Sequence, residues 1–177
     1  MTARLSLVAL VLAATPMAAL AASGSVSMRT IDASGPGAEI GTIAFRDTRQ
    51  GLMLEPRLRS LTPGEHGFHV HEKPDCGPGP GPDGKAAAGM AAGGHYDPKG
   101  TKAHHGPHVT DGHRGDLPVL VVAADGTATV PVLARHLKSG DRRGRTVMVH
   151  AGGDNYADQP APLGGGGARV ACGVVRK

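Results

Sequence analysis

Residues 64–71, Gly-Glu-His-Gly-Phe-His-Val-His, are the stretch from which the rest of this sequence is best interpreted. They predict a β-strand, whose side chains alternate between the two faces of a sheet. His69 and His71 then leave from one face, while Phe68 and Val70 point toward a core. A neutral imidazole has both a donor and an acceptor to satisfy, so two of them on one strand suit a metal site better than a core. Two ordinary surface histidines are the alternative interpretation.

Seven further short stretches have the features of β-strands, with apolar residues bounded by Gly, Pro, Asp or Asn. They are Ser25–Ile31, Glu39–Arg46, Leu52–Leu58, Leu117–Ala123, Thr127–Leu133, Thr146–His150 and Arg169–Val175. The pair Asp125-Gly126 is typical of a hairpin turn, and Pro56 suggests an edge or a bend. No long amphipathic helix is evident. The sequence therefore predicts an all-β fold of about eight strands, an antiparallel sandwich or barrel.

The N-terminal segment, residues 1–21, has the three parts of a secretory signal peptide. Arg4 supplies the positive charge, Leu5–Ala14 is a short apolar run, and Ala19-Leu20-Ala21 fits a cleavage site. The run is too short to span a bilayer, and a buried apolar helix is the alternative. We expect residues 1–21 to be removed on export and residues 22–177 to form one domain with no membrane partner.

The charge of the chain is only mildly positive. Its formal net charge is +4 at pH 7, and removing Arg4 lowers it to +3. No basic cluster is interleaved with aromatic residues, which argues against a nucleic-acid partner. A small positive excess favours a small anionic substrate.

Cys76 and Cys172 are the two cysteines of the chain. In the oxidising compartment that export implies, we expect them to form a disulfide. The chain-entropy model gives roughly 4–5 kcal/mol for closing a loop of this length. A pair of thiolate metal ligands is the disfavoured alternative, because their spacing resembles no zinc motif.

The stretch 72–116, between the fourth and fifth predicted strands, has few helix or strand signals. A loop this long inside a compact domain is normally functional or disordered. A disulfide and a metal can hold such a loop where apolar burial cannot. The residues in it that suit tetrahedral zinc are His95, His104, His113 and Asp116, with His105 and His108 as competitors.

A second group of imidazoles lies on predicted strands. His69 and His71 share one strand, and His150 ends another. Imidazoles held by rigid strands suit copper, which accepts tetragonal nitrogen coordination and has two oxidation states. Any one of the ten histidines could be a solvated loop residue, but most of them gather around one loop and two strand ends.

Six motifs, in this order and spacing, resemble the copper,zinc superoxide dismutases of the bacterial periplasmic type. They are residues 67–72 (GFHVHE), 94–98 (GHYDP), 104–107 (HHGP), 112–117 (GHRGDL), 149–155 (VHAGGDN) and 163–173 (LGGGGARVACG). The resemblance covers nearly the whole mature chain. It implies an eight-stranded antiparallel Greek-key β-barrel or sandwich with long metal-binding and electrostatic loops, a periplasmic location, and a monomer or homodimer.

The resemblance also implies one copper ion and one zinc ion per subunit. The implied copper ligands are His69, His71, His95 and His150, and the implied zinc ligands are His95, His104, His113 and Asp116. His95 would bridge the two metals, and His104 is preferred to His105 because it begins a His-x-Gly-Pro pattern. Asp154 would hydrogen-bond one ligand of each metal. Cys76 and Cys172 match the family disulfide.

The implied activity is dismutation of superoxide to oxygen and hydrogen peroxide by alternate reduction and oxidation of copper. Arg169 would draw the anion to copper, His95 would supply a proton, and zinc would orient His95 without redox work. His66 is expected to be a hydrogen-bonded structural residue, and His108 and His136 to be bystanders.

The loop that follows His150 contains no lysine up to residue 159, so the substrate is expected to be attracted from elsewhere. The candidates are Lys73, Lys85, Lys99 and Lys102. An exported copper and zinc store or chaperone is the competing class, although such a protein tends to lack copper ligands or the arginine. A β-sandwich adhesion module would need neither Arg169 nor a bridging histidine.

Overall fold

The structure of the chain, a computed structural model, describes residues 24–176, so the predicted signal peptide lies outside the described residues. Seven strands form one antiparallel sheet. In order across it they are β5 (Phe68–His71), β10 (Arg145–His150), β11 (Arg169–Val175), β1 (Gly24–Asp32), β2 (Gly35–Thr48), β3 (Gly51–Leu58) and β9 (Val132–Ala134). Two short pairs are β4 (Gly64–His66) with β8 (Leu120–Val122) and β6 (Gly79–Pro80) with β7 (Ala86–Ala87).

The helical elements are short in this part of the chain. They are the α-helix α1 (Ser139–Arg142) and the 3₁₀ turns η1 (Met90–Ala92) and η2 (Pro162–Gly165). Within residues 24–176, no helix combines the length and the apolar character needed to cross a membrane. The prediction of an all-β antiparallel fold is confirmed.

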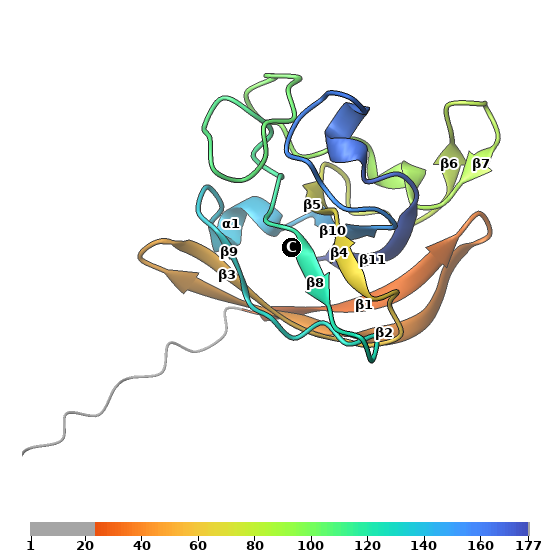
Figure 1. The fold of residues 1–177 in the computed structure, drawn as a ribbon, viewed down its shortest axis with the longest axis horizontal. Helices are drawn as coiled ribbons and strands as arrows, with labels where there is room; N and C mark the ends of the chain where they lie inside the picture. The colour runs from red at the N-terminus through yellow and green to blue at the C-terminus, as the bar shows by residue number, and fades with distance from the viewer. Residues whose placement is uncertain (1–23, 177) are drawn as a thin grey trace, which may run out of the picture.

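The sheet curls around one main core, with β1, β2 and β3 opposite β4 and β8 (Figure 1). A backbone bridge between Leu58 and Ala128 joins β3 to the segment that follows β8. The core is largely aliphatic, as the low aromatic content requires, but it also takes in both phenylalanines of the chain. Its fully buried members include Ile43, Phe45, Leu52, Leu54, Phe68, Leu117, Leu120, Val147 and Val149.

The predicted strand at residues 64–71 is interrupted at Gly67, which separates β4 from β5. The Gly67 amide donates to the Gly152 carbonyl at 2.7 Å, and the Gly67 carbonyl accepts from the His150 amide at 2.8 Å. A Cβ at Gly67 would lie 3.2 Å from the His69 ring and 3.3 Å from the His150 Cβ. The interruption therefore lets the end of β10 approach β5 closely. A larger residue at position 67 would hinder this approach.

Two predicted strands are shorter than expected. The strand predicted at residues 127–133 forms only a bridge at Ala128 and then β9 at Val132–Ala134, because Pro131 has no N–H for a ladder. The strand predicted at residues 117–123 is reduced to β8 after Pro118 for the same reason. Turn chemistry is correctly predicted, since the Gly126 amide donates to the Ala123 carbonyl at 2.9 Å.

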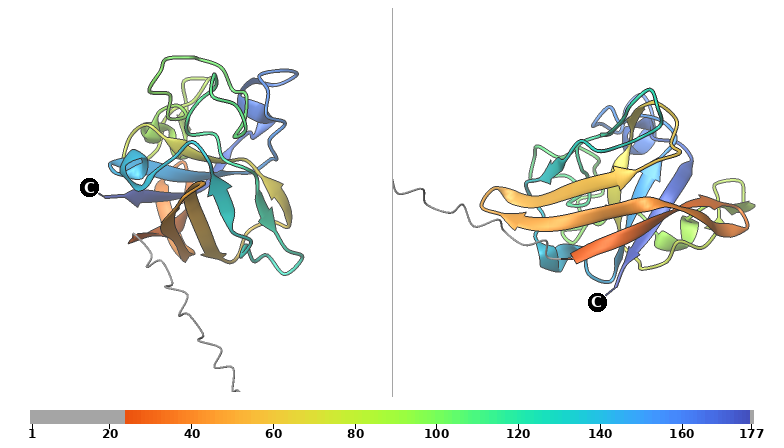
Figure 2. Two further views of the ribbon diagram at one scale, coloured as in Figure 1. Left: turned by 90° about the vertical axis from the view of Figure 1, so that its left-hand side faces the viewer. Right: turned by 90° about the horizontal axis from the view of Figure 1, so that it is seen from below.

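Two long connections lie on the same side of the barrel. One follows β5 and runs to β8, and the other joins β10 to β11 and contains η2; both rise above the sheet in Figure 1 and stay together in the turned view of Figure 2. The ends of β5, β10 and β11 point into this region, so the strands deliver side chains to the space that the two connections cover.

Candidate metal centre

Two neighbouring strands supply three histidines. In the β5–β10 register, Met148 is opposite His69 and Thr146 is opposite His71. His69 and His71 are fully buried, and Phe68 and Val70 from the alternate positions join the main core. The prediction of one histidine face and one core face on this strand is confirmed. His150, at the end of β10, faces the same space.

The long loop returns along the free edge of β5. The Val70 amide donates to the Gly115 carbonyl at 2.9 Å, and the Val70 carbonyl accepts from the Tyr96 amide at 2.8 Å. Backbone bridges consequently join His71 to His95 and His69 to Asp116. The loop is extended here and pairs with the edge of β5 as a strand would. This pairing brings His95 and Asp116 beside the two strand histidines.

The first metal-ligand group consists of imidazoles. Each of its four members offers a ring nitrogen, and these nitrogens all lie within 4.8 Å of one another. The group is His69, His71, His95 and His150. The Nε2 atoms of His71 and His150 are 3.5 Å apart, while their Nδ1 atoms face the carbonyls of Gly93 and Gly167 at 3.0 and 3.2 Å. The outer nitrogens are therefore held by the backbone, and the inner ones are turned toward each other.

The second group adds a carboxylate. Asp116 Oδ1 is 2.9 Å from His95 Nδ1 and 3.5 Å from His113 Nδ1, and Asp116 Oδ2 is 2.9 Å from His104 Nδ1. Three imidazoles thus face one buried carboxylate. Nitrogen ligands with one carboxylate suit zinc.

The tightest grouping of ligand atoms around Asp116 contains His69 in place of His113. His69 Nε2, however, hydrogen-bonds Asp154 Oδ2 at 2.8 Å, so a single nitrogen is left for a metal. His113 stands slightly farther out, with its ring centre 5.4 Å from that of His95. Its Nδ1 faces Asp116 Oδ1 at 3.5 Å, and the single nitrogen left on His69 can serve only one metal, which favours His113 over His69 as the fourth member of this group.

Asp154 connects the two groups. Its Oδ2 accepts from His69 Nε2 at 2.8 Å and its Oδ1 faces His104 Nε2 at 2.7 Å. The Tyr156 amide also donates to Oδ1 at 2.8 Å. A carboxylate that fixes one nitrogen of each ring leaves the other nitrogen aimed at a metal.

The electrostatics of the two groups differ. Burial, followed by the charge of His95, lowers the pKa of His150 to about 4 and holds the pKa of His69 well below its usual value. Burial would also lower the pKa of His104, but Asp116 and Asp154 on either side raise it to about 9. The first group is therefore a set of neutral lone-pair donors, and the second is built around negative charge.

The donor atoms fit two bound cations. Five of the eight buried side-chain nitrogen and oxygen atoms without a hydrogen-bond partner in the described chain belong to this centre. They are His69 Nδ1, His95 Nε2, His104 Nδ1, His113 Nδ1 and Asp116 Oδ2; His104 Nδ1 and Asp116 Oδ2 are 2.9 Å apart but do not meet the geometry of a hydrogen bond. Buried polar atoms are normally paired, so this concentration indicates ligands. His95 is a member of both groups.

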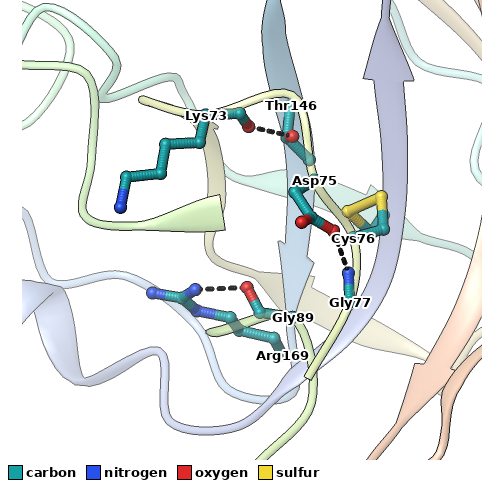
Figure 3. Close-up of a disulfide and its surroundings, with 8 residues drawn as sticks. Lys73, Asp75, Cys76, Gly77, Gly89, Thr146 and Arg169 are labelled. Carbon is teal, nitrogen blue, oxygen red and sulfur yellow. Dashed lines mark hydrogen bonds between the residues drawn. A yellow bond between two sulfur atoms is a disulfide. The ribbon is translucent and has the colours of Figure 1, made fainter. Parts of the chain in front are cut away.

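Arg169 lies at the edge of the imidazole group. Its Nη1 donates to the Gly89 carbonyl at 2.6 Å and its Nη2 to the Gly93 carbonyl at 2.8 Å, the same carbonyl that faces His71 Nδ1. Burial lowers the pKa of Arg169, although a guanidinium stays protonated. Cys76 and Cys172 form a disulfide that holds this part of the loop against β11, as predicted (Figure 3).

The remaining histidines lie outside both groups. Both ring nitrogens of His66 are within 2.7 Å of backbone carbonyls, those of His150 and Thr62, so it is a structural residue as predicted. The His105 ring is 48% exposed beside Asp111, whereas the His104 ring is fully buried. His108 contacts Tyr156 edge-on, and the His136 carbonyl accepts from Arg114.

Two contributors to the centre were not predicted from the sequence. The Gly93 carbonyl links Arg169 to His71, and a backbone carbonyl leaves no side-chain signal. Asp158 accepts from the His104 amide at 2.9 Å and from the Leu163 amide at 3.2 Å, which ties the two long connections together. Asp158 lies in the loop after His150, four residues beyond Asp154, and this position is the sequence feature that could have indicated its role.

The chain was compared with known proteins. The family of copper/zinc superoxide dismutases (SODC) matches residues 39–175. The superoxide dismutase (Cu-Zn) of Haemophilus parainfluenzae is 51% identical over 152 residues, which cover 85% of this chain and 81% of that protein. The Cu/Zn superoxide dismutase from Brucella abortus has a TM-score of 0.83 at 51% identity, covering 86% and 99%. The monomeric copper, zinc superoxide dismutase from Salmonella enterica has a TM-score of 0.76 at 52% identity, with the same coverage.

The fold and the site define a β-barrel metalloprotein with two adjacent metal sites of different ligand chemistry. The chain belongs to the copper/zinc superoxide dismutase family. Its activity is the dismutation of superoxide to oxygen and hydrogen peroxide, and its cofactors are copper and zinc. The Greek-key β-barrel and the oxidoreductase function expected from the sequence are confirmed.

Proposed function

We propose that each metal has its own set of ligands in this chain and that one residue is shared. Copper is held by His69, His71, His95 and His150, and zinc by His95, His104, His113 and Asp116. The observation that carries the assignment is the convergence of five buried, unpartnered donor atoms on one region. Copper, when bound there, supplies the one-electron oxidation and reduction that convert superoxide to oxygen and peroxide.

Arg169 binds the substrate in this proposal. Superoxide is a small anion, and a guanidinium offers a permanent charge with forked donors. Two of its donors are engaged with the Gly89 and Gly93 carbonyls, which fixes the side chain. The same Gly93 carbonyl faces His71, so the arginine is positioned relative to a copper ligand.

His95 delivers a proton. Its Nδ1 is held at 2.9 Å from Asp116 on the zinc side, and its Nε2 is buried without a hydrogen-bond partner. Nε2, which would be a copper ligand, could accept a proton only while it is not bound to that metal, and it could then pass this proton to the reduced oxygen species. Asp116 keeps the His95 ring in place while the proton moves.

The Arg169→Ala variant tests the substrate role. We expect kcat/KM for superoxide to fall by about 10- to 100-fold, because a charged donor at the reacting anion is lost. Both metals should remain bound at full occupancy, and Arg169→Lys should restore part of the rate. Pulse-radiolysis rates with metal analysis of the same samples would measure this. Full activity in Arg169→Ala would exclude the proposed role.

Among the four candidate lysines, Lys73 is the one we propose for attracting substrate. Its Cε lies 3.7 Å from where a Cβ on Gly93 would stand, beside the carbonyl that holds Arg169. Figure 3 shows the Lys73 and Arg169 side chains extending to the same side of the disulfide loop. Lys99 instead bonds the Thr110 carbonyl, and Lys85 is 3.9 Å from Asp83.

Lys73→Gln should lower kcat/KM by about two- to threefold at low ionic strength, and the difference should fade near physiological salt, where charges are screened. Lys99→Gln removes the same charge outside this region and is the control. An unchanged rate at low salt in Lys73→Gln, or an equal decrease in Lys99→Gln, would refute the assignment.

We further propose that residues 1–21 direct the chain to the periplasm and that the mature domain, residues 22–177, acts there as a monomer or a homodimer. The sequence pattern of this N-terminal segment and the disulfide both support export. N-terminal sequencing of the protein from a periplasmic extract, with light scattering for its mass, tests both statements. Recovery of the uncleaved chain from the cytosol alone would contradict the first.

A further inference from the structure

A groove of about 720 Å³ lies where the start of β1, the end of β11 and helix α1 meet. Both views of Figure 2 show these elements side by side near the C-terminal end of β11. The groove is lined by four arginines: Arg29, Arg142, Arg143 and Arg176. Among the described residues that line it, none is Asp or Glu, and none is a ligand assigned above to copper or zinc.

Arg142 is the fixed member of this arginine groove. The residue is 4% exposed, and its guanidinium carbon stands 4.2 Å from the centre of the Phe45 ring. A Cβ at Gly24 would lie 3.6 Å from Arg142 Nη2, so the guanidinium borders the groove at the start of β1. A guanidinium stacked on an aromatic ring loses little freedom when it binds an anion.

The other three arginines are exposed around Arg142. Two carboxylates on neighbouring elements offset part of their charge. Glu39 of β2 stands opposite Arg29 in the β1–β2 register, and the charge of Asp47, which accepts from the Ser139 amide at 3.0 Å, favours the protonated form of Arg142. The groove keeps an excess of positive charge, and the charge of Arg143 repels that of Arg142.

We propose that the arginine groove binds a compact anion carrying two or more phosphate groups. The fork of a guanidinium matches phosphate oxygens in pairs, and the three forks of Arg142, Arg143 and Arg176 at one end of the groove exceed what a single phosphate can use. Cys76 and Cys172 also line the groove, so their disulfide fixes part of its wall. A soluble condensed phosphate and a phospholipid headgroup share this chemistry, and an experiment can distinguish them.

The probe for the soluble source is trimetaphosphate, a cyclic triphosphate that chelates metals weakly. It would be titrated calorimetrically into the metal-loaded protein at low salt and at about 0.15 M salt. We expect one saturable site, with Arg143→Ala and Arg176→Ala each weakening binding by about tenfold. The control is Arg57→Ala/Arg59→Ala, which removes two exposed arginines at the end of β3 and matches the net charge of Arg143→Ala/Arg176→Ala.

Vesicles of phosphatidylcholine with and without cardiolipin, whose headgroup carries two phosphates, test the lipid source with the same pair of double variants. The proposal is supported if binding to either probe is lost in Arg143→Ala/Arg176→Ala and kept in Arg57→Ala/Arg59→Ala. The probe that binds then identifies the ligand as a soluble phosphate or a lipid. The proposal is overturned if neither probe binds, or if both double variants weaken binding equally. The dismutation rate of Arg143→Ala/Arg176→Ala should equal that of the unaltered protein, which verifies its folding independently of the result.

Discussion

The His69→Ala variant is expected to lose dismutase activity by about 1,000-fold or more while it keeps its zinc. A catalytic metal lowers the barrier by several kcal/mol, which corresponds to several powers of ten in rate. His69 is fully buried, and its Nδ1 has no hydrogen-bond partner, so no neighbour can replace this donor. The three remaining imidazoles of the copper group would bind the ion weakly and in an altered geometry.

Zinc should survive this change because its ligands come from the long loop. Asp154 loses its hydrogen bond to His69 but keeps the one to His104, and Asp116 still faces three imidazoles. Metal analysis and the visible spectrum of the copper-loaded protein would measure both occupancies beside the rate.

His105→Ala is the matched control for His69→Ala. The His105 ring is 48% exposed and lies beside Asp111 of the same loop, so its removal should change neither metal nor rate. If His69→Ala retained copper and activity, or if it lost zinc to the same extent as copper, the division into two ligand groups would be wrong.

The strand part of the centre follows from the sequence because β-structure has a fixed period. Alternation in residues 68–71 is enough to place His69 and His71 on one face, whatever the sheet does elsewhere. The end of a neighbouring strand is an equally regular position, which is why His150 could be placed beside them.

The loop part follows less directly. Burial and hydrogen bonding of His104 depend on Asp116, Asp154 and Asp158, which come from two different connections. Composition alone left His104 and His105 as equal candidates, and only the motif resemblance separated them. Their different environments, one buried and one exposed, arise from tertiary contacts that no local pattern contains.

The break at Gly67 and the anchoring of Arg169 were not predictable for the same reason. Gly67 pairs with Gly152 and His150, which are distant in the sequence, and not with a neighbour. Arg169 is held by the carbonyls of Gly89 and Gly93. Nothing in the sequence distinguishes these two glycines from the many others in the chain. The Arg169 contacts involve the loop that the Cys76–Cys172 disulfide and the β5 edge hold against the sheet.

The Asp116→Asn variant should lose zinc affinity by at least about 100-fold and keep the copper group. Asp116 is the one carboxylate that three imidazoles face, at 2.9, 2.9 and 3.5 Å, and these imidazoles hold its pKa well below its usual value against the effect of burial. Asparagine preserves the shape but removes the charge that compensates the cation, and one ligand can contribute several kcal/mol to a structural zinc site.

Loss of zinc should also loosen the long loop, because the proposed zinc site links its His95, His104 and His113. Competition with a chelator would give the zinc affinity, and proteolysis would report the loop. Asp111→Asn, an exposed carboxylate of the same loop, should leave both unchanged. Zinc affinity in Asp116→Asn within a few-fold of the unaltered protein would show that the carboxylate is not a ligand. His95 belongs to both proposed ligand sets, so the decisive result is a difference between the two metals. Copper should be retained by His69, His71 and His150, and zinc should be lost. The His95 ring, which delivers the proton in this proposal, would then no longer be held by Asp116.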